Sequence, residues 1–403
     1  MHDVEIAVVG HGLAGSVAAL ALARSGRKVA LIGPNKAGSD ERTTALMDQS
    51  IRFMDRLGLW NQIAPSSAGL QVMQIIDGTD RLLRAPPAQF RAAELGLAAF
   101  GYNIPNKALL DVLEKAVATE VNIRRIDTTV EKAEPAADKV TLTLGDGESL
   151  DVALAIGADG RNSILRNGAG IDVKKWAYPQ SAVVLNFSHD LPHGNVSTEF
   201  HTETGPFTQV PLPGRRSSLV WVVAPETAER LLALPLDELS LEVERRMQSI
   251  LGKVKVEAGA QSWPLSSLMA KRFGKGRIAL VGEAAHAFPP IGAQGLNLSL
   301  RDVMTLVDLV GNADGRDIAA DTGDRFERRR RPDIMTRTFG VDLLNRSLLS
   351  DFLPKQLARA GGLHLLSGIG PLRNLLMREG VEPGRGFRDL LSTFKPSSHR
   401  KQA

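Results

Sequence analysis

Apolar stretches alternate with small-residue turns from the beginning of the chain. The segment VEIAVVGHGLAGSVAALALARSGRKVALIG predicts a buried strand, a glycine turn, a helix of small and apolar residues and a second strand. Strand, helix and strand in this order form a βαβ unit with parallel strands. We therefore expect the chain to begin with a Rossmann-like domain of the α/β class.

A second segment, LDVALAIGADGRNSILR, repeats the order of strand, turn and helix. Residues 152–156 predict a buried strand, and Asp159 and Gly160 lie in the turn that follows. Asn162 or Ser163 is the expected N-cap of the next helix, because short polar side chains accept hydrogen bonds from free helical amides. By itself the segment is also explained as a structural connection with a capping aspartate.

A third segment, GRIALVGEAAHAFPPIGAQGLNLSL, predicts a strand over 278–281, a turn at Gly282 and Glu283, and a helix from about Leu296. Between turn and helix the loop is rich in proline and small residues, namely Pro289, Pro290, Gly292, Ala293 and Gly295. Such residues fix an extended backbone and carry little side-chain bulk. The loop is therefore suited to close approach of a ligand to the main chain.

The middle of the chain follows a different pattern. Residues 176–265 contain short alternating apolar runs separated by proline and glycine, which predict an antiparallel sheet. Such a sheet would form a second domain. Val210, Leu212 and Trp221 are candidates for a substrate pocket or for the core, and the core is the favoured assignment.

Composition limits the chemistry that the chain can perform alone. The 403 residues are 43% hydrophobic and 23% charged, as in ordinary globular proteins, and the net charge is +4. No cysteine is present, which excludes disulfides, thiolate nucleophiles and iron–sulfur clusters. The sequence offers no nucleic-acid recognition motif, and we interpret the basic run Arg328–Arg331 as a solvated helix face. Without an apolar run of about 18 residues or a signal peptide, a cytoplasmic location is expected.

Histidines give no strong catalytic or metal signal. His189 and His193 have the i, i+4 spacing of metal ligands, but Pro192 prevents the helix that this spacing requires, so no metal site is expected. His286 is better explained as a hydrogen-bonding residue at a turn than as a catalytic group. No catalytic side chain is assigned, and redox chemistry would have to come from a cofactor.

The first glycine turn fits the dinucleotide-binding pattern G-x-G-x-x-G, between a strand and a helix. Gly10 forms the tight turn, Gly12 allows a pyrophosphate to approach the backbone, and Gly15 allows the helix to pack closely on the strand. Free amides at the helix N-terminus would bind the phosphates.

One part of the dinucleotide-binding pattern is missing. An acidic residue is expected at the end of the second strand, where it would hold the adenosine ribose. The chain has Gly33 at this position. Asn35, Asp40 and Glu41 in the following loop are the alternatives for this role, and the sequence does not choose among them.

The three motifs GHGLAG, GADGRNSILR and GEAAHAFPPIGAQGLN occur in this order. Together they resemble the flavin-dependent aromatic hydroxylases with the para-hydroxybenzoate hydroxylase fold, and among these the ubiquinone-biosynthesis hydroxylases. DERTTALMDQSIRFMDRLGLW, YNIPNKALLDVL and GPLRNLLMREG extend the resemblance over nearly the whole chain.

The resemblance implies a domain layout. A discontinuous Rossmann-like FAD-binding domain, an inserted antiparallel-sheet substrate domain and a C-terminal helical region are expected. The FAD domain would comprise residues 1–69, 96–175 and 266–345, the substrate domain 70–95 and 176–265, and the helical region 346–403.

The resemblance also implies a set of cofactor-binding residues. The glycines of the first motif would hold the FAD pyrophosphate, Arg42 would lie along FAD, and Asn106 would contact it from a helix start. Asp159 and Gly160 belong to a motif associated with FAD and transient NAD(P)H binding, and Glu283 would bind the ribityl and pyrophosphate region. The complete set is Gly10, Gly12, Gly15, Arg42, Asn106, Asp159, Gly160, Gly282, Glu283, Pro290, Gly292, Ala293, Gly295 and Asn297, of which the last five would lie beside the isoalloxazine ring.

Two of these positions depart from the family pattern. Glu283 replaces an aspartate and is one methylene longer, and Ala293 replaces a glycine near the ring. With Gly33, these departures raise the question of how firmly the chain holds FAD.

The function implied by the resemblance is hydroxylation of an aromatic ring with NAD(P)H and O2, the ring belonging to a polyprenylated phenol of ubiquinone biosynthesis. The alternatives are a hydroxylase of a soluble aromatic, an FAD-dependent isoprenoid reductase, and a non-catalytic flavin-fold partner of the quinone pathway. The leucine-rich C-terminal segment carries Lys355, Arg359, Arg373 and Arg378. This segment either packs on the FAD domain or contacts a membrane surface or pathway enzymes.

Overall fold

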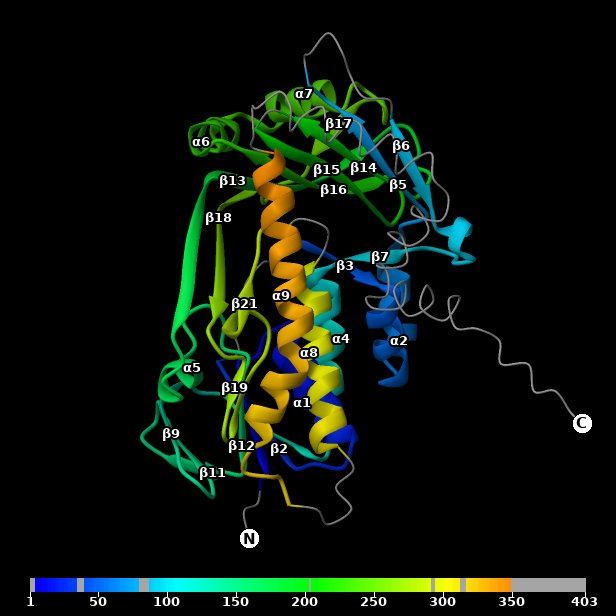
Figure 1. Cartoon of the computed structure of the whole chain (residues 1–403). Helices are drawn as coiled ribbons and strands as arrows, with labels where there is room; N and C mark the ends of the chain where they lie inside the picture. Colours follow the sequence, from blue (N-terminus) through cyan, green and yellow to red (C-terminus); the bar gives the residue numbers. More distant parts are fainter. Residues whose placement is uncertain are drawn as a thin grey trace, which may run out of the picture.

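The computed structural model describes residues 4–34, 40–79, 87–202, 204–290, 294–311 and 317–348. A six-stranded sheet lies at the centre of the first layer (Figure 1). Its order is β19 (Gly274–Lys275), β20 (Ile278–Leu280), β12 (Leu154–Gly157), β1 (Ile6–Val9), β2 (Val29–Ile32) and β8 (Ile123–Ile126). All neighbouring pairs are parallel except β19 with β20. The expected Rossmann-like α/β domain is confirmed.

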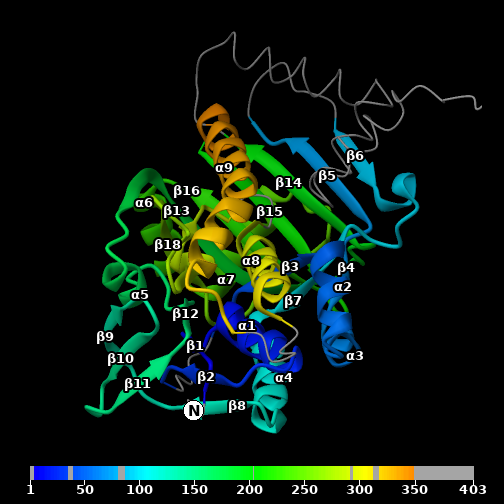
Figure 2. The ribbon, with the colours of Figure 1, turned by 60° about the horizontal axis from the view of Figure 1, so that its bottom comes forward.

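Helices cover the faces of this sheet. α1 (Leu13–Arg24) is buried along almost its whole length, which explains its small and apolar residues, and α4 (Asn106–Thr119) and α8 (Gln294–Val310) pack against it. α9 (Thr322–Leu348) packs on α8, as Figure 2 shows. Among the described residues, no helix is long and apolar enough to cross a membrane.

Two small sheets complete the first layer. β9 (Val130–Pro135), β10 (Val140–Leu144) and β11 (Ser149–Val152) form one, and β4 (Ala68–Gly69), β7 (Gly101–Pro105) and β3 (Thr43–Met47) form the other. The single strand expected over 152–156 is in fact the end of β11 and most of β12. Short helices α2 (Asp48–Arg56), α3 (Trp60–Ile63) and α5 (Ile164–Gly168) follow β3, α2 and β12.

The second layer is a nine-stranded sheet. Its strands are β21 (His286–Ala287), β18 (Gln261–Ala270), β13 (Val173–His189), β16 (Arg216–Val223), β15 (Gly205–Leu212), β14 (Val196–Thr202), β5 (Val72–Asp77) and β6 (Ala88–Arg91), with β17 (Val254–Val256) paired to β13. Most pairs are antiparallel, as the alternating pattern predicts. The expected antiparallel sheet is thus present, and the parallel pairing of β14 with β5 is the exception among its described pairs.

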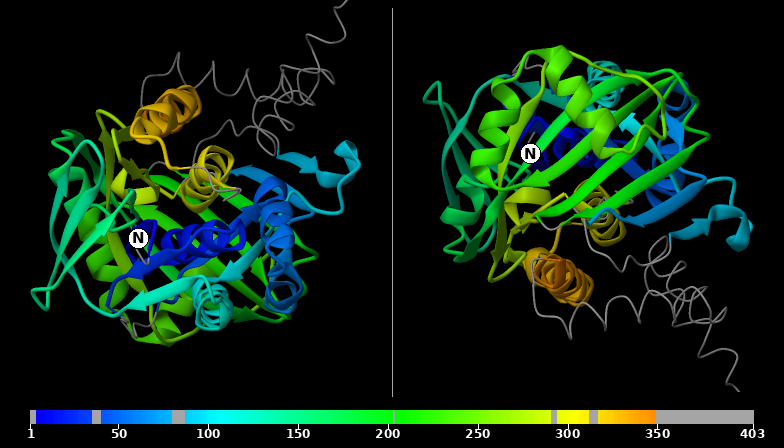
Figure 3. Two further views of the ribbon diagram at one scale, coloured as in Figure 1. Left: turned by 90° about the horizontal axis from the view of Figure 1, so that it is seen from below. Right: turned by 90° about the horizontal axis from the view of Figure 1, so that it is seen from above.

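Two helices cover the outer face of this sheet, seen from above in Figure 3. α6 (Pro225–Ala233) and α7 (Leu236–Arg246) lie within the region that the sequence predicted as strands alone. Apolar residues of both helices pack against sheet residues that include Phe187, Phe207 and Trp221. Trp221 therefore belongs to the core, the assignment that the sequence favoured over a substrate pocket.

The two layers are joined by long strands instead of flexible linkers. The domain boundaries expected after residues 175 and 265 fall inside β13 and β18, and these two strands pair with each other. β21 follows β20 by only a few residues and pairs with β18. The chain thus passes directly from the parallel sheet to the second sheet at the motif around Gly282. Of the expected helical region 346–403, residues 349–403 lie outside the described residues.

Candidate functional site

The glycine turn after β1 is shaped by the protein's own backbone at two positions. Gly10 has a φ of 115°, and a Cβ there would lie 2.2 Å from the carbonyl oxygen of Ala158. A Cβ on Gly15 would lie 1.8 Å from the oxygen of Gly10. Both residues must be glycine for the turn and α1 to pack as they do.

Gly12 differs from these two glycines. It is the N-cap of α1 in extended backbone, and no described residue other than its chain neighbours has an atom within 4 Å of where its Cβ would be. α1 has no side-chain cap and no acidic residue in its first turn. Its N-terminal amides thus lack the side-chain acceptor that helices commonly provide, which suits the binding of a phosphate.

At the end of β2, Gly33 lies close to His11. A Cβ on Gly33 would lie 3.0 Å from both the Cβ and the backbone nitrogen of His11. Of the residues considered as substitutes for the missing acid, Glu41 lies against Gly259, and Asn35 falls outside the described residues. Asp40 contacts Arg42 and Asn106, two of the expected cofactor-binding residues.

Asp40 connects Arg42 with Asn106. Its carboxylate accepts hydrogen bonds from Arg42 Nε at 2.7 Å, Arg42 NH2 at 2.8 Å and Asn106 Nδ2 at 2.9 Å. Burial raises the pKa of Asp40, but these hydrogen bonds outweigh it and hold the pKa below the ordinary value. Asn106 is the first residue of α4 and also accepts from Thr44 Oγ1 at 2.6 Å. The structure thus brings together Arg42 and Asn106, two residues that were predicted to contact the cofactor.

The turn after β12 presents a buried carboxylate. Asp159 Oδ2 accepts the amide of Ile164 at 2.7 Å, and Ser163, the expected alternative to Asn162, caps α5. Asp159 Oδ1 is buried and has no hydrogen-bond partner within the described part of the chain. Burial raises the pKa of Asp159. A buried acceptor without a donor is costly, so this atom fits a polar ligand group at the turn.

The turn after β20 carries the third motif. Gly282 has a φ of 60°, and a Cβ there would lie 2.9 Å from Ser299 Oγ, whereas Glu283 points outward with its side chain 56% exposed. Pro290 is exposed, and within the described ranges only the chain neighbours of Gly295 could lie within 4 Å of a Cβ on this residue. Gly292 and Ala293 lie outside the described residues, so their place beside a ring remains a prediction.

Asn297 has a structural part in this region. Its Oδ1 accepts from Met47 N at 2.9 Å and Ser50 Oγ at 2.7 Å, and its Nδ2 donates to Ala45 O at 2.7 Å. The side chain therefore ties α8 to β3 and α2. Because the Asn297 side chain is used in these hydrogen bonds, the predicted contact with the cofactor ring would be made by the backbone near Asn297.

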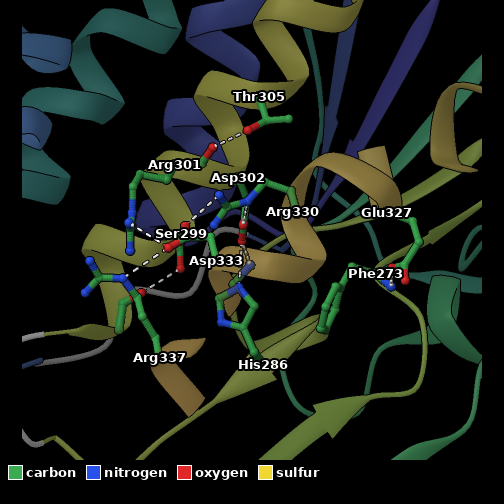
Figure 4. Close-up of polar contacts among 12 residues, drawn as sticks. Phe273, His286, Ser299, Arg301, Asp302, Thr305, Glu327, Arg330, Asp333 and Arg337 are labelled. Carbon is green, nitrogen blue, oxygen red and sulfur yellow. Dashed lines mark hydrogen bonds and ion pairs between the residues drawn. The ribbon is translucent and has the colours of Figure 1, made fainter. Parts of the chain in front are cut away.

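An ionic network behind this turn was missed by the sequence reasoning (Figure 4). Asp302, fully buried on α8, accepts from His286 Nε2 and from Arg330 Nε, both at 2.7 Å, and from the amide of Gly282 at 3.2 Å. Asp333 accepts from Arg330 NH1 at 2.7 Å and Arg301 NH1 at 3.0 Å. His286 is thus a hydrogen-bonding residue, as expected.

The network corrects the reading of the basic run Arg328–Arg331. Arg328 and Arg329 are exposed, but Arg330 is only 5% exposed because α9 turns it toward α8. Burial and the neighbouring Arg337 lower the pKa of Arg301 to about 10. Helical periodicity around Phe326 and Ile334, both fully buried, was the available signal for this inward face.

Replacing His286 by alanine is expected to leave FAD binding largely intact. The ring stacks on Phe288 and bonds Asp302, and both contacts lie behind the turn. We expect a loss of about 1–3 kcal/mol in the free energy of unfolding, because Asp302 loses one donor. Flavin content and urea denaturation of the variant measure the two effects, and a colourless but stable variant would contradict this assignment.

His189 and His193, which have the spacing of metal ligands, form hydrogen bonds within the second sheet. His189 hydrogen-bonds Leu191 O at 2.7 Å and Ser217 Oγ at 3.1 Å, and His193 hydrogen-bonds Leu212 O at 3.0 Å. Across the described ranges, no group of three or more possible ligand side chains could hold a metal ion.

The parallel strands β1, β12 and β20 end at the same edge of the sheet, where α1 presents its uncapped N-terminus and Asp159 presents an oxygen that has no partner among the described residues. This arrangement defines a dinucleotide-binding α/β protein, because such proteins bind the dinucleotide at the carboxyl ends of the parallel strands. The residues present fit FAD, since its pyrophosphate needs backbone amides and its hydroxyls need acceptors.

The chain belongs to the family described as FAD binding domain, FAD_binding_3, whose model matches residues 3–332. It is 33% identical to ubiquinone hydroxylase UbiL of Rhodospirillum rubrum, with 95% of this chain and 92% of the relative covered. It is 30% identical to 3-demethoxyubiquinol 3-hydroxylase of Escherichia coli, with 93% and 97% covered. The protein is an FAD-dependent aromatic monooxygenase.

The fold is also similar to a solved structure. The crystal structure of p-nitrophenol 4-monooxygenase PnpA from Pseudomonas putida matches with a TM-score of 0.76 at 19% identity, covering 96% of this chain and 98% of that chain. This agreement confirms the arrangement of the two layers.

Proposed function

We propose that the chain hydroxylates the aromatic ring of a polyprenylated phenol intermediate of ubiquinone biosynthesis. The observation that carries the proposal is the similarity, over more than nine-tenths of both chains, to two relatives named as ubiquinone-pathway hydroxylases. The overall reaction consumes the aromatic substrate, NAD(P)H, one proton and O2. It yields the phenol product, NAD(P)+ and water.

FAD, when bound, supplies the redox chemistry, and the chain supplies binding, orientation and exclusion of water. In the proposed arrangement, Gly12 and the N-terminus of α1 hold the pyrophosphate. Arg42 and Asn106 lie along the cofactor, and Asp159 and Glu283 accept hydrogen bonds from its hydroxyls. The nine-stranded sheet covers the substrate side.

Partners other than the aromatic substrate and O2 belong to the same proposal. The basic, leucine-rich segment with Lys355, Arg359, Arg373 and Arg378 is where we place contact with a membrane surface or with pathway enzymes, since a polyprenylated substrate resides in lipid. The segment itself lies outside the described residues.

The function is tested by product analysis. The purified protein with FAD and NAD(P)H is given isotopically labelled O2 and either a polyprenylated phenol in liposomes or a soluble hydroxybenzoate. One labelled oxygen in the polyprenylated product, with little turnover of the soluble compound, is the expected result. Labelled soluble product alone would favour a hydroxylase of soluble aromatics. NAD(P)H consumption with reduction of an isoprenoid double bond and no oxygen incorporation would favour the reductase.

A further inference from the structure

Glu283 departs from the aspartate of the resembled family, and the structure shows what accompanies this departure. The residue lies on the short turn Gly282–Ala284 after β20, and its Oε2 is 3.4 Å from Arg161 Nε. Arg161 comes from the turn after β12, 122 positions away in sequence. Two motifs of the expected cofactor site are thus joined by this ion pair.

Arg161 is held in place by further contacts. Its NH1 donates to Ser266 Oγ on β18 at 2.6 Å. Its backbone oxygen accepts from Arg166 NH2 at 2.9 Å, and Arg166 NH1 donates to the oxygen of Ala284 at 3.0 Å. The turns that carry Arg161 and Glu283 are therefore linked by the buried Arg166 as well as by the ion pair. Arg161 reaches Glu283 from a fixed position.

A second arginine, Arg42, is within electrostatic reach of Glu283. The hydrogen bond with Asp40 raises the pKa of the Arg42 guanidinium, and the charge of Glu283 adds to this rise. Glu283 is thus within electrostatic reach of Arg42, but Arg42 directs its own hydrogen bonds to Asp40. Arg161 is the cation that contacts Glu283 directly.

We propose that Arg161 is a positioning residue that fixes the longer Glu283 side chain so that its carboxylate meets FAD. Glutamate has one more rotatable bond than aspartate, and ordering it on binding costs additional side-chain entropy. An ion pair to an anchored guanidinium restricts the carboxylate before the cofactor arrives. Because the ion pair between Arg161 and Glu283 is half-exposed, it contributes little to folding stability. We therefore expect its main effect to be on cofactor affinity. The inference rests on the proposed placement of FAD.

A double-mutant cycle tests this coupling through the dissociation constant of FAD, measured by titration of the full-length apoprotein with flavin fluorescence as the signal. Arg161→Ala is expected to weaken FAD binding about tenfold when residue 283 is Glu. In a Glu283→Asp background the same replacement is expected to weaken it less than about threefold, because the shorter side chain no longer reaches Arg161. Ser266→Ala, which removes the anchor, should act in the same direction with a smaller effect.

Arg328→Ala is the matched control, since it removes an exposed arginine on α9 and should not change FAD affinity. The unfolding temperature of Arg161→Ala should equal that of the parent. Equal losses in the Glu and Asp backgrounds, or no loss in either, would overturn the inference. If Glu283→Ala weakens FAD binding but Arg161→Ala does not, the positioning role of Arg161 is wrong and the proposed cofactor site still stands. If neither Glu283→Ala nor Gly12→Val weakens FAD binding, the proposed cofactor site itself is wrong.

Discussion

Replacement of Gly12 by valine is expected to reduce FAD affinity at least about a hundredfold without unfolding the protein. Gly12 has φ −93° and ψ −176°, a conformation that valine adopts readily, and apart from its chain neighbours no residue in the described part of the chain has an atom within 4 Å of the added Cβ. The fold therefore tolerates the side chain. The cofactor does not, because the isopropyl group occupies the approach of the pyrophosphate to the α1 amides.

Gly15→Ala provides the contrast to Gly12→Val. Its Cβ would meet the oxygen of Gly10 at 1.8 Å, so we expect this smaller change to destabilise the fold itself. Circular dichroism with thermal melting, together with flavin absorbance after gel filtration, separates the two effects. A folded Gly12→Val protein that keeps one FAD per chain would show that the pyrophosphate does not lie on this turn.

Replacement of Asp302 by alanine is expected to cost about 3–5 kcal/mol in the free energy of unfolding. Asp302 is fully buried and is the partner of Arg330 Nε and His286 Nε2. Its removal leaves the guanidinium of Arg330 buried beside Arg301 with less compensating charge, and it releases the amide of Gly282. Urea denaturation monitored by tryptophan fluorescence measures the loss.

A surface control and a double variant test whether the loss comes from the buried ion pair. Asp321→Ala, which removes an exposed carboxylate 3.8 Å from Arg328, should change stability by less than about 0.5 kcal/mol. The double variant Asp302→Leu with Arg330→Met should recover part of the loss, since it removes both buried charges. A loss below about 1 kcal/mol for Asp302→Ala would mean that the network does not hold α8, α9 and the Gly282 turn together.

The same carboxylate predicts a pH dependence. Burial raises the pKa of Asp302, but the charges of His286 and Arg330 outweigh burial and lower it below the ordinary value. Its stabilising contribution is therefore present above the ordinary aspartate pKa of about 4 and is lost as the pH falls through the lower folded value. The stability difference between Asp302→Ala and the parent should accordingly shrink on acidification.

Local sequence patterns were sufficient to predict the parallel sheet and the glycine turn. Gly15 must lack a Cβ because this atom would meet the oxygen of Gly10 within the same βαβ unit, and Ser163 caps α5 through an amide three residues away. Such contacts are encoded by neighbouring residues. Spacing and residue type therefore revealed them.

Contacts between distant segments could not be predicted in this way. Asp302 lies 28 positions from Arg330, and only the packing of α8 on α9 shows that one arginine of a basic run is buried. The parallel pairing of β14 with β5 depends on a crossover that alternating hydrophobicity does not record. Likewise, the sequence identified Glu283 as a departure from the family pattern, but its partner Arg161 became visible only in three dimensions.

The central claim is that the three motifs form one FAD site. The most direct measurement is the visible absorption spectrum of the purified chain after incubation with FAD and removal of unbound cofactor by gel filtration. We predict a retained band of oxidised flavin corresponding to one FAD per chain, despite the departures at Gly33, Glu283 and Ala293. A colourless, folded protein that cannot be reconstituted would contradict the account and would favour a non-catalytic partner of the quinone pathway.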